Sequence, residues 1–230
     1  TAVDGILLDL GVSSMQLNTP ERGFSFLNPG QLDMRMNPNQ RISALKIVNE
    51  TKTEKLANII YEFGEERWSR RIARSIERVR QRNRITTTQQ LAEIISAAIP
   101  RKKRYQKIHP ATRTFQALRI AVNQELENLD IVLNHAITAL KPGGKLCVIS
   151  FHSLEDRIVK RRFRELAKPS NDFSHKSTHQ NLRSPLIKIA TKRPMTASEE
   201  EISTNSRSRS AKLRVCIKIC ESRIMNQTFI

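Results

Sequence analysis

Two apolar segments far apart in the chain restrict the fold most. In Val3–Leu10 four aliphatic residues surround Asp9, and Leu146–Phe151 is a second nearly continuous apolar run. Runs of this kind are typical of parallel strands that are buried on both faces. A helical pattern over Leu154–Ala167 follows the second run. This alternation of strand and helix predicts an α/β fold.

A block of three helices is predicted between the two runs. The first carries a Leu56–Phe63 stripe, has capping-box spacing at Thr51 and Glu54, and stops at Gly64. The second covers Trp68 to Val79, and the third begins at Thr87 and Gln90 and ends at Pro100. The segment Asn18–Gln40 is rich in Pro, Gly and Asn, which predicts a long loop or linker.

The rest of the chain returns to the sheet. Pro110 is positioned to start one long helix whose apolar stripe runs from Phe115 to Leu140. Strands are predicted over 186–190 and 213–219, and the alternating polar face of the second indicates an edge or near-edge strand. The predicted domains are therefore a sheet domain, residues 1–18 and 109–230, and an inserted loop and helical subdomain, residues 19–108.

The net charge points to a polyanionic partner. Lys and Arg number 40 against 22 Asp and Glu, which gives +18, and the basic residues lie between apolar periodic segments rather than in one tail. Nucleic acid is the favoured partner over a disordered basic tail. The basic runs are Arg67, Arg70, Arg71, Arg74, Arg78, Arg80, Arg82 and Arg84, then 101–107, then Arg157, Lys160, Arg161, Arg162 and Arg164.

Other classes are less compatible with the sequence. No apolar run approaches the length that crosses a bilayer, and Thr1–Leu10 contains no targeting pattern, so we expect a soluble protein with no membrane partner. Three cysteines favour a reducing compartment. No metal site is expected, because His175 and His179 lie in a polar, Ser- and Asn-rich stretch.

Polar residues follow both apolar runs, where an open α/β sheet binds its ligands. Asp9 either accepts hydrogen bonds from a ligand or caps a strand-to-helix turn, and the local sequence leaves the two equal. Ser153 is placed to cap the next helix, with Asp156 in its first turn. His152 suits the stacking or hydrogen bonding of a base, although a structural histidine remains about as well supported.

Several longer motifs carry a family resemblance. Ser150–Lys160 reads Ser-Phe-His-Ser-Leu-Glu-Asp-Arg-Ile-Val-Lys, and the other matching segments are Asp4–Ser14, Glu21–Phe26, Leu32–Met36, Tyr61–Arg67, His109–Ile120 and Ser208–Arg214. In this order they resemble the MraW-type methyltransferases that act on cytosine N4 of small-subunit ribosomal RNA. The resemblance covers nearly the whole chain.

The resemblance implies a Rossmann-like class I methyltransferase sheet that uses S-adenosylmethionine, with a helical insertion that helps to hold the target cytidine. Asp9 and Gln16 match residues of the cofactor site. Seven further residues lie in matching motifs and are predicted to bind substrate, namely Arg22, Asp33, Arg35, His109, Arg113, His152 and Ser153. The catalytic residue is left unassigned.

Two departures from the family pattern matter. The family begins with a strand, a glycine-rich loop and an acidic residue that hold the cofactor, and no counterpart precedes Thr1, so we expect an N-terminal truncation and a partial sheet. Ser206 stands where the family tends to have proline, which affects a local turn. An alternative function follows, a non-catalytic basic RNA-binding or ribosome-assembly module.

The mechanism and setting follow from the same resemblance. The cytosine amine is a poor nucleophile until an oxygen acceptor hydrogen-bonds it, and Asp9, Ser13 or Ser14 can supply that oxygen. Phe24, Phe26 or His152 can assist the target in leaving its stack, although a core position fits the phenylalanines better. The expected partner is small-subunit ribosomal RNA or the subunit, in bacterial cytoplasm or the mitochondrial matrix, and a homodimer stays open.

Overall fold

The computed structural model describes residues 2–100, 108–171 and 182–219, and these form two compact units. The sheet unit contains Thr1–Gly11 and Leu126–Ile230, and the helical unit contains Val12–Glu125. Basic residues 101–107, His175, His179 and Cys220 lie outside the described residues. Among those described, no helix is long and apolar enough to span a membrane.

The sheet unit has a mixed sheet with the order β1-β2-β7-β5, and β6 pairs with β7. Its strands are β1 (Val3–Asp9), β2 (Leu140–Ser150), β5 (Ile187–Ile189), β6 (Met195–Thr196) and β7 (Lys212–Lys218). β1 and β2 are parallel, whereas β7 is antiparallel to β2, β5 and β6. β3 (Ser170–Asn171) and β4 (Leu182–Arg183) form a separate pair. The predicted α/β class is confirmed.

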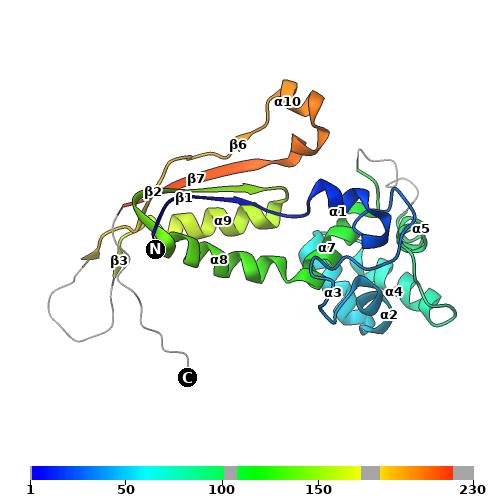
Figure 1. Ribbon diagram of the computed structural model, residues 1–230. Helices are drawn as coiled ribbons and strands as arrows, with labels where there is room; N and C mark the ends of the chain where they lie inside the picture. The colour runs from blue at the N-terminus through cyan, green and yellow to red at the C-terminus, as the bar shows by residue number, and fades with distance from the viewer. Residues whose placement is uncertain (1, 101–107, 172–181, 220–230) are drawn as a thin grey trace. The chain divides into compact units, whose positions relative to one another are not determined.

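One face of this sheet packs against α8 (Glu125–Ala139) and α9 (Ser153–Leu166), as Figure 1 shows. Leu146 and Val148 of β2 point to this face and are buried, whereas Cys147 and Ile149 alternate with them and are half-buried. The expectation that β1 is buried on both faces is wrong for the described residues. Leu7 is 64% exposed, because it pairs with Cys147 on the face opposite to α8 and α9 and β1 is an edge strand of the described sheet.

The charged face of β7 is the buried one. Arg214, Cys216 and Lys218 point toward the covered side, and Leu213, Val215 and Ile217 are half-buried on the other. β7 is next to the edge strand β5, as predicted, but its polar face does not lie in solvent. The Lys218 Nζ atom donates to the carbonyls of Leu140, at 2.6 Å, and Thr138, at 3.1 Å. Burial also raises the pKa of the Cys216 thiol to about 12.

The helical unit is built from amphipathic helices around an aliphatic core. Its helices are α1 (Ser14–Asn18), α2 (Ala44–Glu50), α3 (Thr53–Gly64), α4 (Ser69–Arg80), α5 (Thr88–Ala98) and α7 (Thr112–Asn123), with the 3-10 turn η1 (Pro20–Arg22). Leu56, Ile60, Ile72, Ile76 and Leu91 are fully buried. The three predicted helices α3, α4 and α5 are confirmed, and α2 is a helix that the sequence analysis missed.

The two predicted capping boxes have opposite outcomes. At α5 the Thr87 side chain accepts from the Gln90 N–H and the box is complete. At α3 the prediction is wrong, since Lys52 is the N-cap and gives no side-chain cap. Thr51 instead ends α2, where its N–H donates to the Ile47 carbonyl. The short helix α2, directly before α3, therefore ends at Thr51, which the sequence spacing had assigned to the N-cap of α3.

The long helix predicted from Pro110 to Leu140 is wrong, because two helices occupy that segment. α7 begins at Thr112, and the chain bends at Gln124, whose φ is 50°. The Asn123 side chain accepts from the Met36 N–H at 2.7 Å and donates to the Met34 carbonyl at 2.8 Å. These bonds hold the end of α7 in the helical unit.

The boundaries of the two units differ from the predicted domain boundaries because α7 packs within the helical unit. Gly64 of α3 lies so close to α7 that an added Cβ would be 2.6 Å from the Arg113 carbonyl oxygen. Residues 12–18 and 109–125 thus fall in the helical unit rather than the sheet unit. The division into a methyltransferase domain and a substrate-binding insertion stays a prediction. Near the C-terminus, α10 (Glu199–Thr204) and the 3-10 turn η2 (Ser206–Ser210) precede β7.

Candidate functional site

Asp9 lies at the carboxyl end of β1, where it pairs in register with Ile149 of β2. The next residue, Leu10, donates its N–H to the Ile149 carbonyl at 3.1 Å, and Gly11 then turns the chain with a φ of 88°. The Asp9 side chain is exposed and has no hydrogen bond or ion pair among the described residues. The capping alternative is wrong for α1, because Ser13 is its N-cap. Asp9 therefore offers an uncommitted carboxylate.

Gln16 belongs to the capping box of α1. Its Oε1 atom accepts from the Ser13 N–H at 2.9 Å, and its own N–H donates to the Ser13 Oγ atom at 3.2 Å. The Nε2 group of Gln16 donates to none of the described residues. Gln16 thus has one structural oxygen and a free pair of amide donors, a combination that can bind an anionic group.

His152 is the N-cap of α9, so the assignment of the cap to Ser153 is wrong. The His152 Nδ1 atom accepts from the Glu155 N–H at 3.4 Å, and the Glu155 carboxylate accepts from the Phe151 N–H at 2.8 Å. The His152 Nε2 atom lies 3.2 Å from Glu155 Oε1, and the side chain is 9% exposed. This burial favours the structural histidine. Its role in substrate binding, like that of Ser153, stays a prediction.

Asp156 does not complete that cap but pairs with the far strand. Arg214 Nε donates to Asp156 Oδ1 at 2.7 Å, and its NH2 group donates to Oδ2 at 3.1 Å. Burial by itself raises the pKa of Asp156, but the hydrogen bonds and charge of Arg214 outweigh it and hold the pKa below the ordinary 3.8. The sequence analysis missed this pair, which fixes the first turn of α9 against β7.

Three predicted substrate-binding residues hold the 19–43 loop of the helical unit together. Arg22 donates to the carbonyls of Arg35, at 2.7 Å, and Met36, at 3.1 Å. Asp33 accepts two hydrogen bonds from the Arg35 guanidinium, each 2.7 Å long. Burial by itself raises the pKa of Asp33, but the hydrogen bonds from Arg35 lower it by more. The pKa of Asp33 therefore lies below the ordinary 3.8. These side chains shape the loop, and their contact with substrate stays a prediction.

A ring pair lies at the start of α7. His109 is exposed and packs on Phe26 with ring centroids 4.6 Å apart, and Phe26 in turn meets Phe115 edge-on at 4.8 Å. The Arg113 guanidinium donates to the Glu65 carbonyl at 3.3 Å. Phe24 is buried in the core, as expected for a phenylalanine, and Phe26 is half-buried. His109 and Phe26 form an exposed ring surface that suits contact with a base.

The outer face of α4 is made of arginines. We call this the α4 arginine face, and its members are exposed and form no ion pair among the described residues: Arg67, Arg70, Arg71, Arg74 and Arg78. Arg70, Arg71, Arg74 and Arg78 share one side of the helix, because Arg71 and Arg74 are three residues apart and Arg70, Arg74 and Arg78 follow at steps of four. Arg67 lies just before the helix. Arg80 instead turns inward to Glu77 and the Val48 carbonyl. A row of free guanidinium groups matches the phosphates of a nucleic acid.

The predicted basic run on α9 is more compensated than the sequence indicates. Arg162 pairs with Asp130 at 2.9 Å and with Glu165 at 3.3 Å, and Arg161 lies 3.7 Å from Glu165. Lys160 and Arg164 are exposed and form no ion pair among the described residues. The basic surface of α9 is therefore restricted to part of the helix.

Comparison with known proteins gives a consistent result over nearly the whole chain. The family model described as the MraW methylase family matches residues 1–219. The protein named Ribosomal RNA small subunit methyltransferase H from Halothermothrix orenii is 52% identical over 221 residues, 95% of this chain and 70% of the relative. Proteins of the same name from a Nostoc species and Pelobacter propionicus are 49% and 53% identical, over 96% and 95% of this chain and 67% and 70% of theirs.

Proposed function

Because this chain belongs to the MraW methylase family, we propose that it methylates small-subunit ribosomal RNA with S-adenosylmethionine, at the exocyclic N4 amine of a cytidine. The observation that carries the proposal is the identity of about half of all residues to relatives whose name states small-subunit ribosomal RNA methylation. A Rossmann-like methyltransferase sheet is part of the proposal. The parallel β1 and β2, with Asp9 at their carboxyl ends, support it.

The residues present fit the cofactor by the chemistry of their donors and acceptors. S-adenosylmethionine supplies a methyl group on a positively charged sulfur. Asp9 has a free carboxylate that can accept from an amine or from ribose hydroxyls, and Gln16 has free amide donors for a carboxylate. We assign these two residues to the cofactor, with the seven motif residues left for the substrate.

The acceptor amine sets a second requirement. Its lone pair is delocalised into the cytosine ring, so an oxygen that accepts its hydrogen bond is needed to favour charge on nitrogen during transfer. Asp9, Ser13 and Ser14 are exposed and carry such oxygens. Methyl transfer leaves two protons on a positively charged nitrogen; one of them is then lost to solvent and the other stays on the product, and no general base is assigned.

The helical unit supplies two of the proposed contacts to RNA. The α4 arginine face binds phosphates, and the exposed His109–Phe26 pair offers a ring surface for an unstacked base. The arginine face is also the observation that favours the second candidate, a non-catalytic RNA-binding or ribosome-assembly module. Both candidates predict RNA binding, and methyl transfer separates them.

The test uses the chain in the length that its gene encodes. Transfer of a labelled methyl group from S-adenosylmethionine to small ribosomal subunits is measured, and the RNA is digested to nucleosides to identify the product. We expect N4-methylcytidine. Asp9→Asn should reduce the transfer rate by about 100-fold, because the amide loses the negative charge that Asp9 offers to the cofactor and to the charge that develops on the amine.

The matched control is Asp4→Asn on the same strand. Asp4 is exposed and pairs with Lys141 at 3.0 Å, so its loss should leave the transfer rate unchanged. RNA binding without methyl transfer would reject the enzyme and leave the RNA-binding module. Methylation at another atom would keep the enzyme class and reject the N4 assignment.

A further inference from the structure

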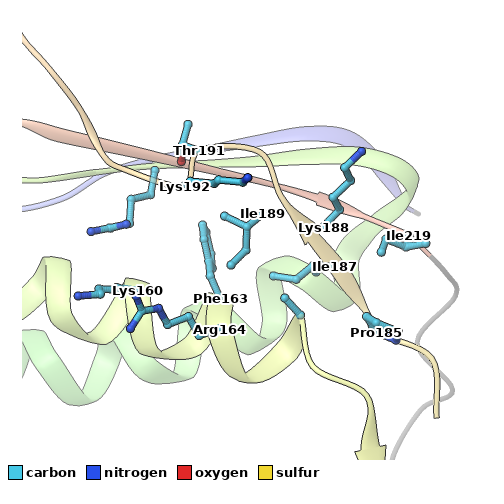
Figure 2. A pocket seen from close by; sticks show the side chains of 12 residues that line it. Lys160, Phe163, Arg164, Pro185, Ile187, Lys188, Ile189, Thr191, Lys192 and Ile219 are labelled. Atoms are coloured by element: carbon cyan, nitrogen blue, oxygen red, sulfur yellow. The ribbon is translucent and has the colours of Figure 1, made fainter. Parts of the chain in front are cut away.

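A cleft of about 560 Å³ opens between the C-terminal half of α9 and the segment of β5 with the residues that follow it. Figure 2 shows its lining. The cleft lies wholly in the sheet unit and contains none of the predicted site residues. Arg164, on its wall, is 12 residues beyond His152, which is roughly 18 Å along the helix axis at 1.5 Å per residue. The lining also includes Lys160 and Arg214, which binds Asp156 in the first turn, so the cleft extends from the middle of α9 to its C-terminal end.

The floor of the cleft is apolar. Phe163 projects from α9 toward the strand, and Ile187 and Ile189 project toward Phe163 (Figure 2). Phe163 and Ile187 are each 1% exposed, so they belong to the core and form a rigid base, while Ile189 is half-buried. This surface can pack against a flat or aliphatic group but not against a bare ion.

The rim of the cleft is cationic. Lys160, Arg164 and Lys192 are exposed and have no ion pair or hydrogen-bond partner among the described residues. Arg214 also reaches the lining, but Asp156 compensates its charge. Among the residues that the structure describes, no Asp or Glu lines the cleft. The net charge of the rim is therefore positive, and the rim attracts anions.

An apolar floor with a cationic rim matches a ligand that carries both a flat ring and a phosphate. We propose that this cleft binds one nucleotide of an RNA strand, with the base on the apolar floor at the half-buried Ile189 and the phosphate at Lys160, Arg164 and Lys192. The inference rests on the proposed function in taking the strand to be small-subunit ribosomal RNA. The nucleotide is one that flanks the methylated cytidine, because none of the predicted site residues lines the cleft.

The cleft differs from the α4 arginine face in the chemistry of its surface. That face offers guanidinium groups on an exposed helix and contacts backbone phosphates. The cleft adds a cavity with a hydrophobic base, so it should distinguish a nucleotide that has its base from one that lacks it. Free phosphate or polyphosphate has no base and therefore contacts only the cationic rim, not the apolar floor.

The test uses photo-crosslinking and binding with the full chain. Single-stranded RNA from the small subunit that carries 4-thiouridine is irradiated with the protein, and crosslinked peptides are identified by mass spectrometry. We expect crosslinks in residues 187–192 or 160–167. Lys160→Gln with Arg164→Gln should weaken RNA binding about 10-fold and lower the salt slope by roughly 1.4, at 0.7 for each lost phosphate contact.

A matched double variant, Lys145→Gln with Lys55→Gln, removes two charges from exposed lysines outside the cleft. It should change the affinity by less than about 2-fold. An oligonucleotide with an abasic site at the crosslinked position should bind about 5-fold more weakly than the intact strand, and this difference should disappear in the cleft variant.

The proposal is overturned if crosslinks avoid these peptides, if the cleft variant binds RNA like the matched variant, or if the abasic strand binds equally well. Tight binding of an acidic peptide that RNA does not displace would also overturn it. Methyl transfer is scored separately. Crosslinks at the cleft without any methyl transfer would reject the proposed enzyme function and support nucleotide binding in the cleft. Normal methyl transfer without crosslinks at the cleft would support the enzyme function and reject nucleotide binding in the cleft.

Discussion

The two units treat their charged residues in opposite ways. In the helical unit, α4 turns Ile72 and Ile76 inward and presents its arginines to solvent. In the sheet unit, β7 turns Arg214 and Lys218 inward and leaves Leu213, Val215 and Ile217 half-exposed. The sequence pattern is regular in both elements. Only in α4 does the apolar side coincide with the buried side.

The difference shows that periodicity identifies the faces of an element but not which face is covered. A long aliphatic stripe on α4 faces a core of other aliphatic residues, so its direction follows from the hydrophobic effect. β7 has charged residues whose partners come from other elements. Asp156 on α9 binds Arg214, and the carbonyls of Thr138 in α8 and Leu140 at the start of β2 bind Lys218. These partners make burial of the charges tolerable.

The largest effect should come from the inward face of α4. Ile76→Ala removes a fully buried side chain and leaves a cavity, so it should lower the free energy of unfolding by about 3 kcal/mol. Arg74→Ala on the outward face of the same helix should change it by less than about 0.5 kcal/mol. Urea unfolding followed by circular dichroism measures both. Equal losses would show that α4 is covered on both sides.

The next effect tests the inward charge of β7. Arg214→Met leaves the Asp156 carboxylate with one weaker partner, Lys212 at 3.8 Å, and should lower the free energy of unfolding by about 2–3 kcal/mol. Asp156→Asn in the Arg214→Met background should recover part of this loss, since no charge is then buried. A neutral effect of Arg214→Met would place Arg214 in solvent and contradict the comparison.

The pH dependence of the free energy of unfolding tests the Arg214–Asp156 pair in a second way. The pKa of Asp156 is lowered in the folded chain, so the pair contributes fully above the ordinary 3.8 and its contribution is lost as pH falls through the lowered value. In Arg214→Met the remaining burial favours the protonated carboxyl, so acid relieves the defect. The difference in free energy of unfolding between wild type and variant should therefore shrink from pH 7 to pH 3.

The smallest effect on stability should accompany a clear effect on binding. Arg70→Gln, Arg71→Gln and Arg74→Gln together should change the free energy of unfolding by less than about 0.5 kcal/mol. The same triple variant should lower the salt slope of RNA binding by about 2, at 0.7 for each lost phosphate contact. Fluorescence anisotropy across a salt series measures the slope. An unchanged slope would remove the α4 arginine face from the RNA interface.

The residues of the candidate site could be predicted from the sequence, but the roles of several of these residues could not. The motifs mark Asp9, Arg22, Asp33, Arg35 and His152 from the sequence alone. The structure shows that Arg22 and Arg35 bind backbone carbonyls in a loop and that His152 caps a helix. Carbonyl groups carry no signal in a sequence, because every residue has one. A polar motif residue can therefore be structural, functional or both.

The sequence by itself determined the α/β class, the helices α3, α4, α5 and α9, the family and the excess of positive charge. These follow from local periodicity, long motifs and composition, which neighbours in the chain specify. Tertiary structure alone decided the break at Gln124 and the inward charges of β7. Each depends on a hydrogen-bond partner outside the local pattern, such as Asp156 for Arg214 across 58 residues, and such partners become neighbours only when the chain folds.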